Sequence, residues 1–395
     1  MAKSTSGQKG DKVRSDCYIE ITSTRNGGIN LTIKSKVNVM YGESIKTTIL
    51  DMCEFFELKN AEIVVEDYGA LPSTLMARFE LAVKRLIPTI EKEFLPEFNK
   101  ENTYKTTKDK LRRSRLYLPG NEPKFYPNAG LHKPDAIILD LEDSVAATEK
   151  DAAQLIVRNA LRSINFYGAE RMVRINQLPL GLDDLKYIIP NNVHVILIPK
   201  VETAKQILQV EAKVNELKFA NKIENEIFFM PIIESALGVI NAYSIASASK
   251  YNCALAIGLE DYTADIGTQR TNEGKESFFA RSAIVNAAKA AGIQAIDTVF
   301  SDVNDMNGLR DSVIEAKGLG FEGKGCIHPR QIQIVHQAFA PTESEIEKAQ
   351  KIVAAFEEAK AKGLGVVSIG SKMIDAPVVK RAINTLKLSD LMKTI

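Results

Sequence analysis

The chain has 395 residues, of which 45% are hydrophobic and 26% charged, a balance typical of a globular protein of about two domains. The formal net charge is +1 and no apolar run approaches the roughly 20 residues of a spanning helix, so neither nucleic acid nor a membrane is expected as a partner. A polar N-terminus without a secretory signal, and four widely spaced cysteines without a CxxC pair, predict a cytoplasmic protein with reduced thiols.

The first part of the chain predicts a flexible N-terminus over residues 1–15 and a small α+β domain over 16–88. The segments YIEIT and GINLTIKSKV alternate apolar and polar residues, and the Asn26-Gly27-Gly28 turn between them predicts a β-hairpin. SIKTTILDMCEFFELK and LPSTLMARFELAVKRLI have helical spacing, and AEIVVED between them is typical of a third strand. Residues 89–112 are polar and charged, which predicts a linker with some helix.

From residue 113 to 340, short apolar runs alternate with helical stretches. Such runs are typical of a parallel sheet covered on both faces, and eight of them predict a (β/α)8 TIM barrel. A doubly wound open sheet is the alternative, but no GxGxxG follows the first strand. Residues 341–395 predict two helices around a short strand, VVSIG. The eight runs are RLYLPG, DAIILDLED, RMVRINQ, VHVILIPKVE, EIFFMPIIES, CALAIGLED, QAIDTVFSD and GKGCIHP.

The carboxyl ends of these predicted strands carry many charged residues, at the end where barrel enzymes place their chemistry. Any one of them could belong to a structural salt bridge, but a whole set indicates a site, because unpaired buried charges are costly. Two carboxylates on neighbouring strands, Glu234 and Asp261, predict an octahedral Mg²⁺ site. The four histidines lack ligand spacing, which disfavours zinc. The charged strand-end residues are Asp140, Glu142, Asp143, Arg174, Lys200, Glu202, Glu234, Glu260 and Asp261.

Several motifs in combination resemble the citrate lyase β subunit, within the wider citrate lyase and acyl-CoA lyase group of barrel enzymes. They are RRSRLYLPGNEP, DAIILDLEDSV, VRIN, PIIESALG, IGLEDYTADIGTQR and GSKMIDAP, and the resemblance runs through residues 112–390. Separately, YGESIKTTILDMCEFFELKNAEIVVEDYGALPSTLMARFE is similar to the citrate lyase γ subunit, which is an acyl carrier protein. The resemblance implies a fused β/γ subunit that cleaves a citryl thioester to oxaloacetate and an acetyl thioester.

The resemblance also implies roles for individual residues. Glu234 and Asp261 would bind Mg²⁺, Arg174 would bind a substrate carboxylate, and Arg115 would lie near the thioester side. The backbone around Gly258, Leu259 and Glu260 would hold the oxo-acid end. Asp375 would be an acid/base on a C-terminal lid segment that closes over a neighbouring subunit's site, which implies a homo-oligomer, with a trimer favoured.

The chemistry of such a cleavage agrees with these residue types. The hydroxyl proton of the substrate must be removed, which suits a carboxylate, and the developing carbonyl must be polarised, which suits Mg²⁺. Lys200 could form a Schiff base, but the metal already supplies the electron sink.

The carrier-like part departs from its family at the attachment point. A serine there carries a phosphoribosyl-dephospho-CoA arm, whereas this chain has Arg14 in that place and Ser15 as the neighbouring candidate. With the arm, a citrate lyase α-like transferase subunit is an expected partner. The alternatives are a free-standing citramalyl-CoA or malyl-CoA type lyase, or a non-catalytic scaffold that keeps a metal and oxo-acid pocket.

Overall fold

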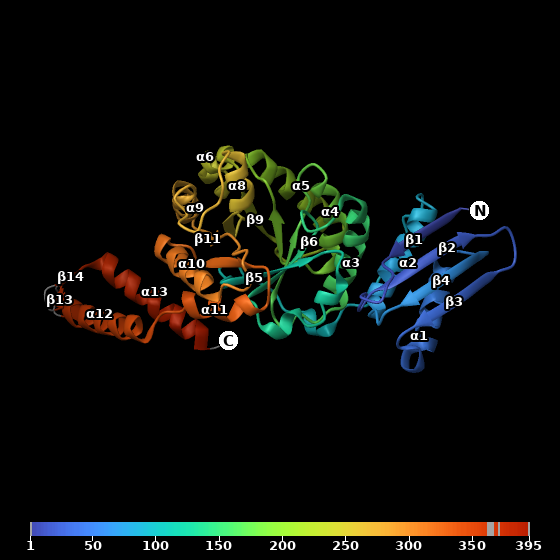
Figure 1. Cartoon of the computed structure of the whole chain (residues 1–395). Coiled ribbons are helices and arrows are strands. Elements are labelled where there is room, and N and C mark those ends of the chain that lie inside the picture. The colour runs from blue at the N-terminus through green and yellow to red at the C-terminus, as the bar shows by residue number, and fades with distance from the viewer. Residues whose placement is uncertain (1, 362–366, 370–371, 394–395) are drawn as a thin grey trace.

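The computed structural model of the chain describes residues 2–361, 367–369 and 372–393. An N-terminal α+β domain, a central barrel and a C-terminal helical hairpin follow one another in a row (Figure 1). Within the described ranges, no helix combines the length and apolarity needed to cross a bilayer.

The central unit is a closed barrel of eight parallel strands in sequential order, which confirms the predicted TIM barrel. Each predicted run supplies one strand. The strands are β5 (Ser114–Pro119), β6 (Ala136–Asp140), β7 (Glu170–Arg174), β8 (Val195–Ile198), β9 (Phe228–Ile233), β10 (Ala254–Ile257), β11 (Gln294–Asp297) and β12 (Gly323–Cys326). The surrounding helices are α3 (Lys150–Ser163), α4 (Gly181–Ile188), α5 (Ala204–Ala220), α6 (Ala236–Ile240), α7 (Ala242–Ala246), α8 (Leu259–Asp265), α9 (Phe278–Ala290), α10 (Met306–Leu319) and α11 (Arg330–Phe339).

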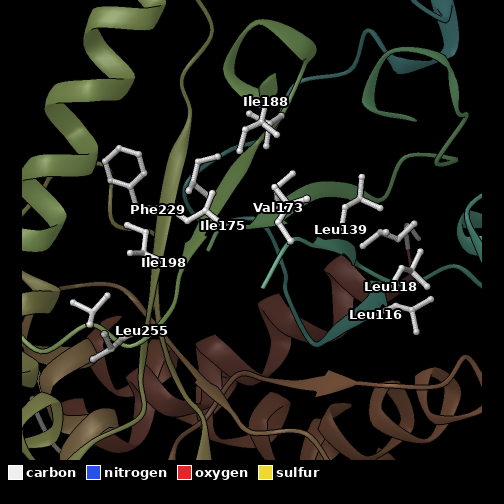
Figure 2. Close-up of a cluster of buried hydrophobic side chains, with 14 of the residues drawn as sticks. Leu116, Leu118, Leu139, Val173, Ile175, Ile188, Ile198, Phe229 and Leu255 are labelled. Carbon is white, nitrogen blue, oxygen red and sulfur yellow. The ribbon is translucent and has the colours of Figure 1, made fainter. Parts of the chain in front are cut away.

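The strands are mostly apolar because both of their faces are buried. In β6, Ile137 and Leu139 point outward into the layer between strands and helices, part of which Figure 2 shows. Ala136 and Ile138 of the same strand point inward and pack with Met172 and other side chains inside the barrel. These two apolar layers hold the strand ends, and therefore the site, in a fixed frame.

The N-terminal domain corrects two predictions. Residues 3–7 are not flexible but form a strand, β1 (Lys3–Gly7), whose buried Ser4 donates to the Ala82 carbonyl oxygen at 2.7 Å. Small polar side chains give this strand no apolar alternation, which is why the sequence pattern missed it. The predicted hairpin is also wrong, because β2 (Cys17–Ser23) and β3 (Ile29–Ser35) do not pair with each other.

The strand β4 (Ala61–Asp67) lies between them, antiparallel to β2 and parallel to β3. The buried Ile63 and Val65 of β4 suit the centre of the sheet, whereas the inward residues of β3 are only half-buried and suit an edge. The helices α1 (Asn38–Phe55) and α2 (Pro72–Leu86) agree with the predicted helical segments and pack against the sheet.

Charged side chains fix the N-terminal domain to α3 of the barrel. Arg78 of α2 forms a bidentate pair with Asp16 inside the N-terminal domain, at 3.0 and 2.7 Å, and its Nη1 lies 3.7 Å from Glu149 Oε2, just ahead of α3. Arg158 of α3 forms a second bidentate pair with Glu80 of α2 at 2.8 Å, and both side chains are fully buried.

The predicted linker is held against the barrel rather than extended. It contains one 3-10 turn (Lys100–Asn102). The Tyr104 hydroxyl donates to the Ala169 carbonyl oxygen at 2.7 Å, and the fully buried Arg112 pairs with Glu170 of β7 at 2.7 Å. These contacts leave the linker little freedom to let the two domains move apart.

The C-terminal segment forms a helical hairpin that projects away from the barrel (Figure 1). Its elements are α12 (Glu343–Ala361), β13 (Val367–Ile369), β14 (Lys372–Ile374) and α13 (Ala376–Lys393). Ala349 and Ile352 of α12 pack with Val379 and Ala382 of α13 in a separate small core.

The buried pair of Arg78 and Asp16 inside the N-terminal domain predicts a specific cost. Arg78→Ala leaves the carboxylate of Asp16 buried without its partner, so we expect a loss of roughly 3–5 kcal/mol in the free energy of unfolding. Arg85→Ala is the matched control, because Arg85 lies on the same helix but its pair with Asp151 of α3 is solvent-exposed and is expected to contribute about 0–1 kcal/mol. Urea unfolding of the two variants gives the comparison, and equal losses would contradict it.

Candidate active site

A cavity of about 350 Å³ opens at the carboxyl ends of the barrel strands. The charged residues that line it come from the ends of five strands or the turns after them, together with Arg115 near the start of β5, and the closed barrel brings them to one place. They are Arg115, Asp140, Asp143, Arg174, Glu234, Glu260, Asp261 and Asp297. All of the predicted barrel site residues line this cavity.

Arg174, at the end of β7, is clamped by the neighbouring strand. Its Nε and Nη2 donate to the two oxygens of Asp140 at 2.7 Å each, and its Nη1 lies 2.8 Å from Glu142 Oε2. Burial alone would lower the pKa of Arg174, but the hydrogen bonds and charge of Asp140 outweigh it and raise that pKa. From the sequence, the Arg174 guanidinium was predicted to bind a substrate carboxylate. In the structure, two of its nitrogens already donate to Asp140.

Lys200 follows β8 and sits among carboxylates. Its Nζ lies 3.4 Å from Glu142 Oε1, 3.6 Å from Asp143 Oδ1 and 3.7 Å from Asp261 Oδ1. Its backbone is in the left-handed region, with φ of 50°, which is uncommon for a residue with a side chain and typical of functional sites. The same turn points the Lys200 amide at Glu234 Oε2, 2.9 Å away.

Glu234, directly after β9, is 6% exposed. Burial raises its pKa to about 7, and the negative charge of Glu142 adds to the effect. Gly258 lies beside it, and a Cβ there would come within 2.8 Å of Glu234 Cγ. Gly258 therefore creates the room in which the Glu234 carboxylate sits.

The turn from β10 into α8 carries the other predicted residues. Asp261 is partly exposed at the cavity edge, whereas the Glu260 side chain turns to solvent and pairs with Arg270 at 2.6 Å. The Leu259 amide donates to Thr298 Oγ1 at 3.3 Å and the Gly258 amide donates to the Ile233 carbonyl oxygen at 2.9 Å.

Three further charged residues form a network in the barrel wall that sequence reasoning did not assign. Asp297, at the end of β11, accepts from Lys324 of β12 at 2.6 Å and from Arg281 of α9 at 3.2 Å. All three side chains are buried. The available signal was a lysine and an aspartate inside the runs GKGC and QAID, where branched apolar residues are usual.

Asp375 and Ser15 lie outside the cavity. Asp375 precedes α13, where its Oδ1 accepts from the Val378 amide at 3.2 Å, and Figure 1 shows this part of the hairpin far from the barrel of its own chain. Ser15 lies in the turn between β1 and β2, where its amide donates to the Tyr68 carbonyl oxygen at 3.0 Å.

The donor set fits a hard divalent cation. Glu234 and Asp261 line one cavity and present carboxylate oxygens. Among the described residues, no group of three or more His, Cys, Asp or Glu side chains is arranged to hold a metal. Magnesium commonly takes one or two protein carboxylates and fills its remaining positions with water and substrate oxygens. Burial and the charge of Glu142 raise the pKa of Glu234, and a bound cation would stabilise its charged form.

Comparison with known proteins gives a family for the barrel. The HpcH/HpaI aldolase/citrate lyase family matches residues 113–329. The chain belongs to this family. A second family, described as malonate decarboxylase delta subunit (MdcD) and acyl-carrier-like, matches residues 5–86, a range that begins inside β1.

Curated relatives of this family cover most of the same region. Citrate lyase subunit beta of Leuconostoc mesenteroides subsp. cremoris is 43% identical over 71% of this chain and 94% of the relative. Human mitochondrial citramalyl-CoA lyase is 34% identical over 71% of this chain and 86% of the relative. The structure of CitE from Mycobacterium tuberculosis with magnesium, acetoacetate and coenzyme A matches with a TM-score of 0.60 at 27% identity, over 72% of this chain and 100% of that one.

Membership in the HpcH/HpaI aldolase/citrate lyase family confirms the predicted class, a carbon–carbon lyase on a TIM barrel. The second match confirms that the N-terminal domain is acyl-carrier-like.

Gly258 offers a direct test of the predicted metal ligand. In Gly258→Ala the new Cβ displaces the Glu234 carboxylate, while φ of −109° lets the backbone accept alanine. We expect the affinity for Mg²⁺, measured by calorimetric titration, to fall about 10- to 100-fold, as for other losses of ligand positioning. Gly318→Ala in α10, where a Cβ meets nothing within 4 Å, is the matched control and should bind Mg²⁺ as the wild type does. Equal affinities in both variants would contradict the assignment.

Proposed function

We propose that this chain is a Mg²⁺-dependent lyase that cleaves a citryl thioester to oxaloacetate and an acetyl thioester, as a fused β/γ citrate lyase-like subunit. The observation that carries the proposal is the cavity that joins Glu234, Asp261 and Arg174 at the barrel mouth. The 43% identity to a citrate lyase β subunit and the magnesium in the related CitE structure support it.

The residues of this chain have distinct roles in the proposed reaction. Glu234 and Asp261 would hold Mg²⁺, which polarises the carbonyl that forms when the carbon–carbon bond breaks. Arg174 Nη1, the one guanidinium nitrogen outside the bidentate bond to Asp140, lies 2.8 Å from Glu142 and 3.5 Å from Asp143 and would turn to the substrate carboxylate. The backbone at the start of α8, at Gly258, Leu259 and Glu260, would hold the oxo-acid end, with the Leu259 amide exchanging its 3.3 Å bond to Thr298 Oγ1 for one to the ligand.

The proton in this reaction moves from oxygen to carbon. A base takes the hydroxyl proton, the carbon–carbon bond breaks, and the electron pair passes to the thioester enolate, which is then protonated at carbon. We assign this acid/base role to Asp375 of a neighbouring protomer, because Asp375 does not line the cavity of its own chain. The hairpin of α12 and α13 then acts as a lid in a homo-oligomer, for which a trimer is proposed.

The carrier-like domain would deliver the acyl group on a phosphoribosyl-dephospho-CoA arm attached to Ser15. This arrangement implies a citrate lyase α-like transferase subunit as a partner. The alternative is a free-standing lyase for citramalyl-CoA, which the 34% identity to the human enzyme favours. Intact-mass measurement of protein from its native host separates the two, because only the first adds the mass of the arm.

Removing a metal ligand tests the proposed chemistry. Glu234→Ala should keep the fold, because the residue lies beyond the strand, and should lower Mg²⁺-dependent release of oxaloacetate from citryl-CoA by more than about 100-fold. Glu216→Ala on α5, whose side chain is exposed and pairs with Lys213, is the control. Normal Mg²⁺-dependent cleavage by Glu234→Ala would show the ligand assignment to be wrong.

Action of Asp375 across subunits predicts complementation. Asp375→Ala and Glu234→Ala are each expected to be inactive, but mixed oligomers contain sites with an intact Glu234 from one protomer and an intact Asp375 from another. Activity should therefore return on mixing, at the rate of subunit exchange, which differently tagged protomers report. If exchange is complete and activity stays absent, Asp375 does not act in a neighbouring site.

A further inference from the structure

The floor of the cavity contains a guanidinium without a carboxylate partner. Arg115 is the second residue of β5, points into the barrel and is 2% exposed. Its Nη1 lies 3.1 Å from Met230 Sδ and its Nη2 lies 3.4 Å from the Asp297 carbonyl oxygen. Its Nε has no hydrogen-bond partner among the described residues. Among the other buried arginines, Arg78, Arg112, Arg158 and Arg281 face a carboxylate. Arg171, at the end of the barrel strands opposite the cavity mouth, instead donates to the Asn192 carbonyl oxygen and contacts His194.

The surroundings of Arg115 do not supply the missing negative charge. The nearby carboxylate of Asp297 is already shared by Lys324 and Arg281. Burial lowers the pKa of both Arg115 and Lys324 below their ordinary values, which shows that the barrel interior disfavours their charge. Because an uncompensated buried charge is costly, a bound anion at this place would stabilise the site.

The position of Arg115 relative to the metal ligands limits what that anion is. Arg115 crosses the barrel from β5 to β9, which stand opposite each other in the closed strand order. Met230, Ile232 and Glu234 occupy every second position of β9 and the residue after it. Met230 and Glu234 are therefore about 13 Å apart along the strand direction. That length accommodates the Glu234 side chain, a cation bound to it, a small ligand on the cation, and one hydrogen bond from the ligand to the Arg115 guanidinium. Arg115 and Glu234 line the same cavity.

The cavity is therefore polarised from its rim to its floor. The rim carries Asp143, Glu234 and Asp261, which suit a cation, beside Arg174, whose charge Asp140 and Glu142 offset. The floor carries Arg115, which suits an anion. A ligand that fits both ends chelates a metal at one end and carries a carboxylate at the other. A 2-oxo diacid has this form, whereas a 2-oxo monoacid leaves the guanidinium unpaired.

We propose that Arg115 binds the distal carboxylate of the oxo-diacid half of the substrate, in place of the thioester side that the resemblance implied, and is a specificity-determining residue. This inference rests on the proposed function and deepens it. The site selects an acyl thioester with –CH2–COO⁻ on the carbinol carbon over one with –CH3 there. Only the substrate with this carboxylate pairs the buried Arg115 guanidinium and removes the energetic cost of leaving it unpaired. An analogue without the carboxylate leaves that cost in place and is therefore rejected.

The test uses two substrates that differ by that one carboxylate, citryl-CoA and citramalyl-CoA. The change Arg115→Met replaces the guanidinium with an apolar side chain that suits the adjacent Met230. We expect kcat/KM for citryl-CoA to fall about 100-fold while kcat/KM for citramalyl-CoA changes less than about 5-fold, since one buried charged contact is lost. Thermal unfolding checks the fold, and Arg115→Met should be at least as stable as the wild type.

A binding measurement separates this inference from the proposed reaction. Calorimetry with Mg²⁺ should show that the wild type binds oxaloacetate more tightly than pyruvate, and that Arg115→Met loses this preference with an unchanged Kd for pyruvate. Equal losses on both ligands, or an unchanged preference for oxaloacetate, would overturn the role of Arg115. If the wild type cleaves neither thioester but shows the preference, the proposed reaction fails and the carboxylate site stands.

Discussion

Crowding of negative charge at one end of the barrel is the constraint on which the site depends. Asp140, Glu142, Asp143, Glu234 and Asp261 converge on a single opening because parallel strands end at the same edge. Arg174 offsets part of this charge by its bidentate bond to Asp140, and Lys200 lies between three other carboxylates. Burial still raises the pKa of Glu142 and of Glu234 to about 7, so the arrangement favours the arrival of a cation.

The barrel and its site could be predicted because their signals are local and strong. Eight apolar runs, each followed by charged residues, fix both the strands and the edge at which their side chains meet. The partners within that edge were not predictable, because they depend on which strands become neighbours. The bond from Arg174 to Asp140 needs β6 beside β7, and the contact of Arg115 with Met230 needs a closed barrel.

The small domain shows where a local pattern fails. Asn26-Gly27-Gly28 between two alternating strands is a strong hairpin signal, yet β4 inserts between those strands. Pairing of β4 with both neighbours buries Ile63 and Val65 at the sheet centre, and this tertiary gain is invisible to a short sequence window. The strand β1 was missed for the opposite reason, since its inward residues, Ser4 and Ser6, are polar.

The fixed position of the carrier-like domain bears on how an arm could work. The buried pair of Arg158 with Glu80 holds this domain against α3, so the attachment point cannot travel and the arm alone must cover the distance. The loop with Ser15 shares a cavity with Glu122–Lys124, which follow β5 at the carboxyl end of the barrel. Ser15 therefore lies on the side of the barrel where the site opens. An arm raises the effective concentration of its acyl group at the site only when its length matches the distance from the attachment point to the site. A rigid attachment point on the same side as the cavity keeps that distance constant.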